Sequence, residues 1–267
     1  MKDLKEFIGF EYANLSEDGK LTYYILQQKG EYARFLDEVV QKVDIGNAVV
    51  RNEIRSLVEE IYKLSYSGLV NSVKESQNIN ELSAALYSVR ASTPEVVQRA
   101  VENPISGLTL SDTLQKNRQQ VIYNIKQQIG IGLTQGDTIR TMANRISEVL
   151  DKDYRKAIRI ARTEVHRVRE AGFNDSATEI DNVLQNGSTG IRLIKLWKTM
   201  KDERVRDGEA DHVRMEGQAV LADEKFTLSN GAKTVAPGQS GYANQDINCR
   251  CYVSYQLIHE KEYKKSK

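Results

Sequence analysis

The feature that most limits how this chain can fold is the scarcity of helix-breaking proline. The second is a change in the spacing of apolar residues near residue 185. Only three prolines occur in 267 residues, and none of them interrupts a helical pattern of apolar residues: Pro94, Pro104 and Pro237. Because proline removes a helical hydrogen bond and clashes with the preceding turn, its scarcity favours long helices. Residues 1 to about 175 are therefore predicted to form helices joined by short turns.

Apolar residues at spacings of three and four locate the helices in this region. The clearest is Asp137–Leu150, where Asp137 or Thr138 is expected to cap the N-terminus. The Leu, Ile, Val and Tyr content of two earlier predicted helices, Leu21–Val43 and Val49–Lys74, suits them to bundle packing. The other predicted helices are Leu21–Val43, Val49–Lys74, a helix that begins at Thr93-Pro94, and about Tyr154–Phe173.

The period changes to that of strands after a loop predicted at Leu184–Gly190. Arg192–Thr199 is expected to be a strand with Leu193 and Trp197 on one face, and Cys249–Leu257 alternates cleanly as a second strand. The fold class is therefore α+β, with a mainly helical, elongated N-terminal bundle before a small α+β domain with a few antiparallel strands. The expected segments are helical regions 1–110 and 111–182, the small α+β domain 183–260, and a frayed basic tail 261–267.

Composition excludes several classes of protein. No apolar run approaches the roughly 20 residues that cross a bilayer, and the charged N-terminus gives no reason to expect a secretory signal. The only cysteines, Cys249 and Cys251, are too close together to close a useful loop. A disulfide scaffold is therefore excluded, and a reducing compartment is expected.

Charge is unevenly distributed along the chain although the total is near zero. The sequence has 38 basic and 37 acidic residues, a formal net charge of +1. Residues 116–169 hold 12 basic and 5 acidic residues, a net of +7. This stretch is either a solvated helix face or a surface for a phosphate backbone. The candidate DNA contacts are Arg155, Arg159, Arg162, Arg167 and Arg169.

The two cysteines belong to a short motif, Cys249–Cys251 (CRC), at the start of the second predicted strand. Residues i and i+2 of a strand face the same way, so both thiolates could bind one zinc ion, with His212 as the third ligand. Structural zinc takes about four ligands, and Asp202 or Asp211 could supply an oxygen. The alternative is a pair of buried free thiols that pack as small apolar side chains. No cofactor other than zinc is indicated.

Two further groups of polar residues could carry chemistry. Asp202, Arg206 and His212 follow the first predicted strand, where they could form a proton-transfer site or simply pair their charges. Thr163 and Glu164 follow Arg162 in a predicted helix, and surface ion pairs explain them equally well. The sequence has no P-loop, GxGxxG, HExxH or GxSxG motif, so no catalytic residue is assigned.

Three groups of motifs follow one another along the second half of the chain. The first is Ile131–Asp137 (IGLTQGD), followed by a helix carrying Arg162, Thr163 and Glu164. The second is Trp197, Asp202 and Arg206, then His212 and Gly217. The third is Pro237-Gly238, then Asn248 immediately before the CRC motif.

This ordered set, over about residues 115–257, resembles the phage head morphogenesis or minor head proteins with a Mu F-like domain. Some members carry extra Cys and His residues where this chain has Arg206 and Asn248, so the resemblance implies that a zinc site here would be incomplete. Related domains also precede toxin domains in larger proteins. Because this sequence stops soon after the CRC strand, no toxin domain is expected.

The resemblance implies a structural protein of the phage head rather than an enzyme. Such proteins are made beside the portal and act in head morphogenesis and in DNA packaging or delivery. The expected partners are the portal protein, with the scaffold or major capsid protein and double-stranded DNA as further candidates, and no membrane. The expected location is the virion, and the host cytoplasm during assembly.

Two other function classes remain open at this stage. A metal-dependent nuclease or other hydrolase would use Asp202, His212 and the cysteines, although no metal-hydrolase motif supports it. A cellular helical scaffold unrelated to phage would share the long helices but not the ordered motifs.

Overall fold

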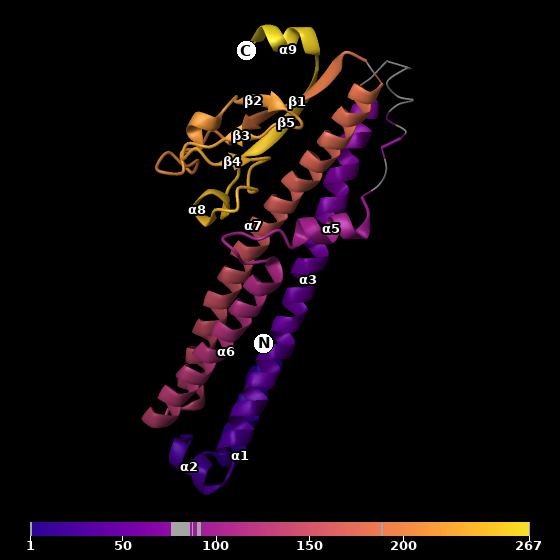
Figure 1. Cartoon of the computed structure of the whole chain (residues 1–267). Helices are drawn as coiled ribbons and strands as arrows, with labels where there is room; N and C mark the ends of the chain where they lie inside the picture. Colours follow the sequence, from indigo (N-terminus) through magenta and orange to yellow (C-terminus); the bar gives the residue numbers. More distant parts are fainter. Residues whose placement is uncertain (1, 76–85, 87, 90–91, 188, 267) are drawn as a thin grey trace. The chain divides into compact units, whose positions relative to one another are not determined.

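The computed structural model describes residues 2–75, 86, 88–89, 92–187 and 189–266, and it is α+β, with long helices first and a small antiparallel sheet region last (Figure 1). The expected fold class is confirmed. The residues form two compact units: unit 1 is Met1–Arg55 with Ser111–Ile160, and unit 2 is Ser56–Leu110 with Ala161–Lys267.

Unit 1 is a helical bundle around one apolar core. Its core residues recur at helical spacing, as Val121, Ile125 and Ile129 do, so each helix buries one stripe. Phe7 stacks on Phe35 with ring centroids 5.9 Å apart. The elements are α1 (Lys2–Leu15), α2 (Tyr23–Gln28), most of α6 (Leu110–Gln135) and the unit 1 portions of α3 (Tyr32–Glu75) and α7 (Ile139–Asn186).

Unit 2 contains the sheet. Strand β1 pairs antiparallel with both β2 and β5, in the order β2-β1-β5, and β3 and β4 form a separate two-stranded ladder. The strands are β1 (Ile191–Lys198), β2 (Ala219–Leu221), β3 (Phe226–Thr227), β4 (Lys233–Thr234) and β5 (Tyr252–His259). The unit also holds α5 (Pro94–Val101), the 3-10 helix η1 (Val213–Met215), α8 (Ala243–Asp246), α9 (Glu260–Ser266) and the remaining portions of α3 and α7.

The sheet of unit 2 packs against the C-terminal part of α7. Ala177, Ile180 and Leu184 of α7 share an apolar cluster with Leu193 of β1. Lys195 points from the same face of β1 and is fully buried, and its Nζ donates to Asn174 Oδ1 and Val235 O, both at 2.9 Å. Burial lowers the pKa of Lys195 to about 8.

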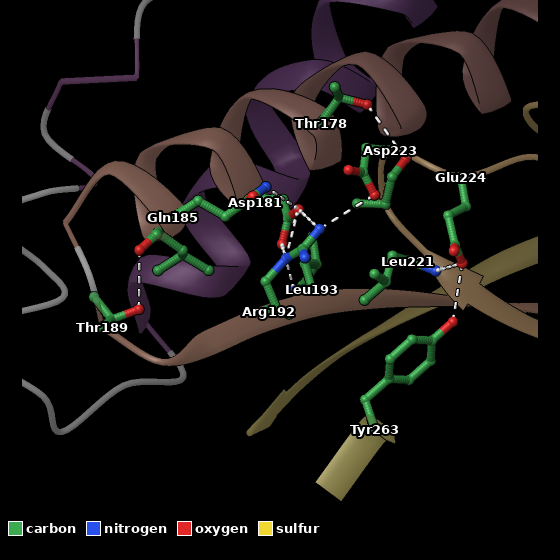
Figure 2. Close-up of polar contacts among 12 residues, drawn as sticks. Thr178, Asp181, Gln185, Thr189, Arg192, Leu193, Leu221, Asp223, Glu224 and Tyr263 are labelled. Carbon is green, nitrogen blue, oxygen red and sulfur yellow. Dashed lines mark hydrogen bonds and ion pairs between the residues drawn. The ribbon is translucent and has the colours of Figure 1, made fainter. Parts of the chain in front are cut away.

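A buried carboxylate joins the end of α7 to β1 (Figure 2). Asp181, fully buried, accepts hydrogen bonds from the Arg192 guanidinium and from the Leu193 N–H at 2.7 Å. Just after β2, Glu224 accepts from Leu221 N and from Tyr263 Oη at 2.9 Å, which attaches α9 to β2. Asp181 therefore links the sheet to α7, and Glu224 links the sheet to α9.

Two predicted helix boundaries are wrong. Asp137–Leu150 and Tyr154–Phe173 are parts of one helix, α7, because the polar residues between them include neither proline nor glycine. Val43 and Val49 likewise lie in one helix, α3, since a single Gly46 is tolerated at a cost of about 1 kcal/mol. A real break occurs earlier, at Gly30, which has a left-handed φ of 68°.

The predicted helix starts are confirmed in position. Thr93 precedes α5, with Pro94 as its first residue. At the start of α7, Thr138 Oγ1 accepts from Thr141 N at 3.4 Å. Asp137 is not the cap, because its Oδ2 accepts from Arg145 Nε at 2.5 Å.

The predicted bounds of the second strand, the loop before the first strand and the C-terminal tail need correction. β1 matches the predicted strand within one residue, but β5 begins only at Tyr252, so the CRC motif lies before the strand. Asn248, with a left-handed φ of 58°, turns the chain just ahead of it. The predicted loop Leu184–Gly190 is shorter, since α7 continues to Asn186, and the predicted frayed tail is α9.

The two compact units do not coincide with the expected segments 1–110, 111–182, 183–260 and 261–267. Each unit is assembled from separate stretches of sequence, because α3 and α7 each contribute to both. In the described part of the chain, no helix combines the length and the apolarity needed to cross a membrane.

Candidate functional site

Unit 2 gathers three buried side chains, His212, Cys249 and Cys251, into what we call the His-Cys cluster. His212 immediately precedes η1, and the cysteines lie between α8 and β5. The ring of Trp197 meets His212 edge to face at a centroid distance of 5.7 Å. Three separate segments therefore meet at the cluster: β1, the segment before η1, and the segment between α8 and β5.

The imidazole of His212 faces both thiols. Its Nδ1 lies 3.6 Å from Cys249 Sγ and 3.5 Å from Cys251 Sγ. The cysteines are free thiols, and the three potential ligand atoms all lie within 4.8 Å of one another. The prediction that both sulfurs face the same way is therefore confirmed, although the motif lies outside the strand.

The cluster is held in position from the side away from the thiols. Gln245 Oε1 lies 2.7 Å from His212 Nε2, so the imidazole N–H there donates to the amide oxygen and leaves Nδ1 without a proton in the neutral ring. The backbone of Arg206 accepts from His212 N at 2.8 Å. The Arg206 guanidinium donates to the carbonyl oxygens of Gln245 and Ile247, which fixes the segment that leads to the cysteines.

The two thiols differ in their electrostatics. The pKa of the Cys249 thiol is raised well above its usual range by the contact with Cys251, and burial adds to this rise. The pKa of the Cys251 thiol is lowered by the contact with Cys249 and by the nearby Trp197 indole, although burial opposes this change. Burial alone would lower the pKa of His212, but the contacts with Cys249 and Gln245 together outweigh it and raise that pKa. The contact between the thiols thus moves the pKa values of Cys249 and Cys251 in opposite directions.

A small hollow opens beside the cluster. It has room for about one water molecule, at about 10 Å³, and all three cluster residues line it. Its remaining lining residues are Arg204, Val205, Arg206, Asn248 and Arg250. Three arginines therefore contribute to the lining of the opening that the thiols and the imidazole meet.

Two polar side chains of α7 attach the backbone around Cys251 to the helix. His166 Nε2 lies 2.6 Å from Cys251 O, and Glu170 Oε2 accepts from Val253 N at 3.1 Å. Burial raises the pKa of Glu170 to about 7 and lowers that of His166 to about 4. Sequence analysis missed both residues, although their spacing of four on a helix next to apolar positions is a usable signal. Gln245 carries no comparable signal in the sequence.

The motif Arg162, Thr163, Glu164 is divided between surface and interior. Arg162 is exposed, whereas Thr163 and Glu164 are buried, and Thr163 Oγ1 accepts from Asn248 N at 3.3 Å. The expectation that Thr163 and Glu164 belong to surface ion pairs is wrong, because Glu164 accepts from the equally buried Arg167 at 2.8 Å.

Arg167 is not available as a DNA contact, which corrects one of the five candidates. It is 1% exposed, and its guanidinium also donates to Ala100 O and Val101 O at the end of α5, each at 2.6 Å. Arg155, Arg159 and Arg162 are exposed and form no ion pair with a described residue. Arg169 is partly exposed and pairs with Glu170 at 2.6 Å.

The remaining motif residues form hydrogen bonds, ion pairs and a turn near the cluster without joining it. Asp202 accepts from Arg250 Nη2, and Asp211 lies 3.0 Å from Arg214 Nε, so neither carboxylate joins the cluster. Gly217 has a left-handed φ of 79° and donates its N–H to Trp197 O at 2.8 Å. That turn returns the chain from the His212 segment to β1.

Comparison with known proteins identifies the family. Residues 123–254 match the family described as phage Mu protein F-like protein. The chain is 30% identical over 259 residues to the minor head protein GP7 of Bacillus phage SPP1, which covers 96% of this chain and 78% of that protein. This chain belongs to the phage Mu protein F-like family of minor head proteins, as the ordered motifs indicated.

A second relative is named as an enzyme. The NAD(+)--arginine ADP-ribosyltransferase EFV of Enterococcus faecalis (strain ATCC 700802 / V583) is 30% identical over 215 residues. The match covers 80% of this chain but only 41% of that protein. No solved structure matches this chain.

Proposed function

We propose that this chain is a structural component of the phage head, located in the virion, that acts in head morphogenesis and in DNA packaging or delivery. It does so by contacting the portal protein, double-stranded DNA, or both. The observation that carries the proposal is the similarity to the SPP1 minor head protein along nearly the whole chain. Contacts with the scaffold or major capsid protein are a further part of the same proposal.

The DNA part of the proposal rests on exposed arginines of α7. Arg155 and Arg159 lie four residues apart in unit 1, so one turn of helix separates them on the same face. Arg162 is likewise exposed in unit 2. Without a described carboxylate to neutralise them, these guanidinium groups are available for phosphate oxygens, which they bind in a bidentate manner.

Charge reversal at these arginines tests the DNA contact. Each true phosphate contact contributes about 0.9 to the slope of log K against log salt, so R155E/R159E should flatten the slope by about 1.8. The matched control is K20E/K63E, which changes the net charge equally at two exposed lysines outside the basic stretch. If R155E/R159E binds duplex DNA with the wild-type affinity and slope, these arginines do not contact DNA.

We also propose that the chain acts without catalysis. The alternative is a metal-dependent nuclease or other hydrolase that uses Asp202 and His212. The two side chains that this alternative needs already have hydrogen-bond partners. His212 has a partner at each ring nitrogen, and Asp202 accepts from Arg250. Incubation of duplex DNA with the untagged protein, Mg²⁺ and Zn²⁺ should leave the DNA intact, and cleavage that H212N abolishes would establish the alternative.

A further inference from the structure

We propose that Cys249, Cys251 and His212 bind one zinc ion whose fourth coordination position opens into the hollow beside Arg206 and Asn248. This inference does not depend on the portal or DNA contacts proposed above. It concerns a site formed entirely within unit 2.

The spacing of the ligand atoms fits a tetrahedral zinc ion. With Zn–S near 2.3 Å and Zn–N near 2.0 Å, tetrahedral angles separate a sulfur from a nitrogen by about 3.5 Å. The observed separations between His212 Nδ1 and the two sulfurs are 3.6 and 3.5 Å. An ion could therefore enter between the three atoms without rearrangement of the backbone.

The imidazole is oriented as a metal ligand would be. A ligating histidine usually donates its other ring N–H to an oxygen, which fixes the tautomer and turns the unprotonated nitrogen toward the ion. Gln245, itself buried, supplies that oxygen at 2.7 Å from Nε2. For a simple pair of buried thiols, an imidazole held with Nδ1 between them would serve no purpose, because apolar packing needs no polar side chain.

Charge balance favours a divalent ion that prefers sulfur. Two thiolates and a neutral imidazole around Zn²⁺ give a net charge of zero, which is tolerable at a site where all three ligand residues are buried. Thiolate and imidazole ligands suit zinc, whereas magnesium and calcium prefer oxygen. No aspartate or glutamate joins the cluster within the described residues.

The fourth position is left to a ligand from outside the chain. The hollow touches all three ligand residues and is lined on its other sides by Arg204, Arg206, Asn248 and Arg250. Arginine does not lose its proton and cannot coordinate, so it can only attract an anion toward the ion. Three protein ligands with one open position is the arrangement in which zinc retains water, hydroxide or another exchangeable ligand.

Metal analysis of untagged protein tests the ligand set. The wild type should contain about one equivalent of zinc, and C249S, C251S and H212N should each retain below about a tenth of that. The matched control is H259N, which alters an exposed histidine outside the cluster and should keep the full equivalent. Zinc that survives in the cysteine variants overturns the proposal.

A second measurement on the wild type remains informative if those variants fail to fold. Both thiols should resist alkylation in the zinc-loaded protein and react after a chelator removes the ion. A zinc-free wild type that cannot be loaded, with unchanged thiol reactivity, also overturns the proposal.

Cobalt substitution tests the open position separately. Co²⁺ in the site should give a thiolate-to-cobalt charge-transfer band and the intense visible bands of tetrahedral coordination, both absent from C251S. Addition of thiocyanate should shift the visible bands, because the anion replaces the exchangeable fourth ligand. Visible bands that do not change at saturating thiocyanate would show a site closed by four protein ligands and contradict the open position.

Discussion

Replacing Arg167 by methionine should destabilise unit 2 strongly, because this arginine joins α5 to α7 inside the protein. Its guanidinium donates to Glu164 at 2.8 Å and to the carbonyl oxygens of Ala100 and Val101 at 2.6 Å each. Those carbonyls lie at the C-terminus of α5, where no later turn of the helix supplies a donor. R167M therefore leaves three buried acceptors without their charged partner.

The magnitude follows from the burial of the pair. A hydrogen bond to a charged group contributes about 1.5–3 kcal/mol net, but some of the lost bonds are replaced by water as the region relaxes. Removal of one partner of a buried ion pair costs about 3–5 kcal/mol, and we expect R167M to lower the unfolding free energy by that amount. Burial already raises the pKa of Glu164 against the opposing effect of Arg167, so protonation of Glu164 should recover part of the loss at low pH.

Denaturant unfolding followed by tryptophan fluorescence measures this loss directly, since Trp197 is the only tryptophan and lies in unit 2. R162M, at an exposed position five residues earlier in α7, is the matched control and should change the unfolding free energy by less than about 0.5 kcal/mol. A cost below about 1 kcal/mol for R167M, or an equal cost for both variants, would refute the structural role assigned to Arg167.

Three further predictions follow from side-chain positions. Gly172→Ala should destabilise unit 2 by about 1–3 kcal/mol despite the better helix propensity of alanine, because the new Cβ would lie 2.6 Å from Tyr62 O. Gly68→Ala, with open space around its Cβ, should instead stabilise by about 0.5–1 kcal/mol, and thermal unfolding of both variants checks the sign. Lys195 has a folded pKa of about 8, below the 10.5 of the unfolded chain, so the unfolded state binds more protons between these values. Its contribution to stability should therefore rise by up to about 3 kcal/mol from pH 8 to 10.5, and K195M should lack this rise in denaturant unfolding against pH. Gln245→Leu should weaken zinc binding by about 10–100-fold in a chelator competition while unfolding stays cooperative, and an unchanged affinity would mean that Gln245 does not orient His212.

The sequence predicted the fold class and the family, but not how the helices divide the chain into units. The change of period after α7 and the alternation in β5 were sufficient to predict an α+β protein. Helix breaks were predicted at residues 44–48, which contain Gly46 between Asp44 and Asn47, and at the polar residues 151–153. Polar residues do not end a helix when no proline is present and packing stabilises the turns on either side.

The candidate site was only partly predictable for a related reason. His212 and the two cysteines are rare residue types, so they could be singled out without knowledge of the fold. His166 and Glu170 are distant from the cysteines in sequence, and Gln245, although only four residues before Cys249, is distant from His212. All three act through hydrogen bonds that depend on how α7, α8 and the CRC motif pack. Arg167 was indistinguishable from its exposed neighbours, because the four arginines between residues 159 and 169 of one helix differ only in which way each faces.

The most direct test of the proposed function is sedimentation of the untagged protein with assembled rings of the portal protein of the same phage, and in parallel with duplex DNA in Mg²⁺ and Zn²⁺. The account predicts that the protein sediments with the portal, with DNA in a salt-sensitive manner, or with both, and that the DNA stays intact. Failure to bind either partner, or cleavage of the DNA, would contradict it.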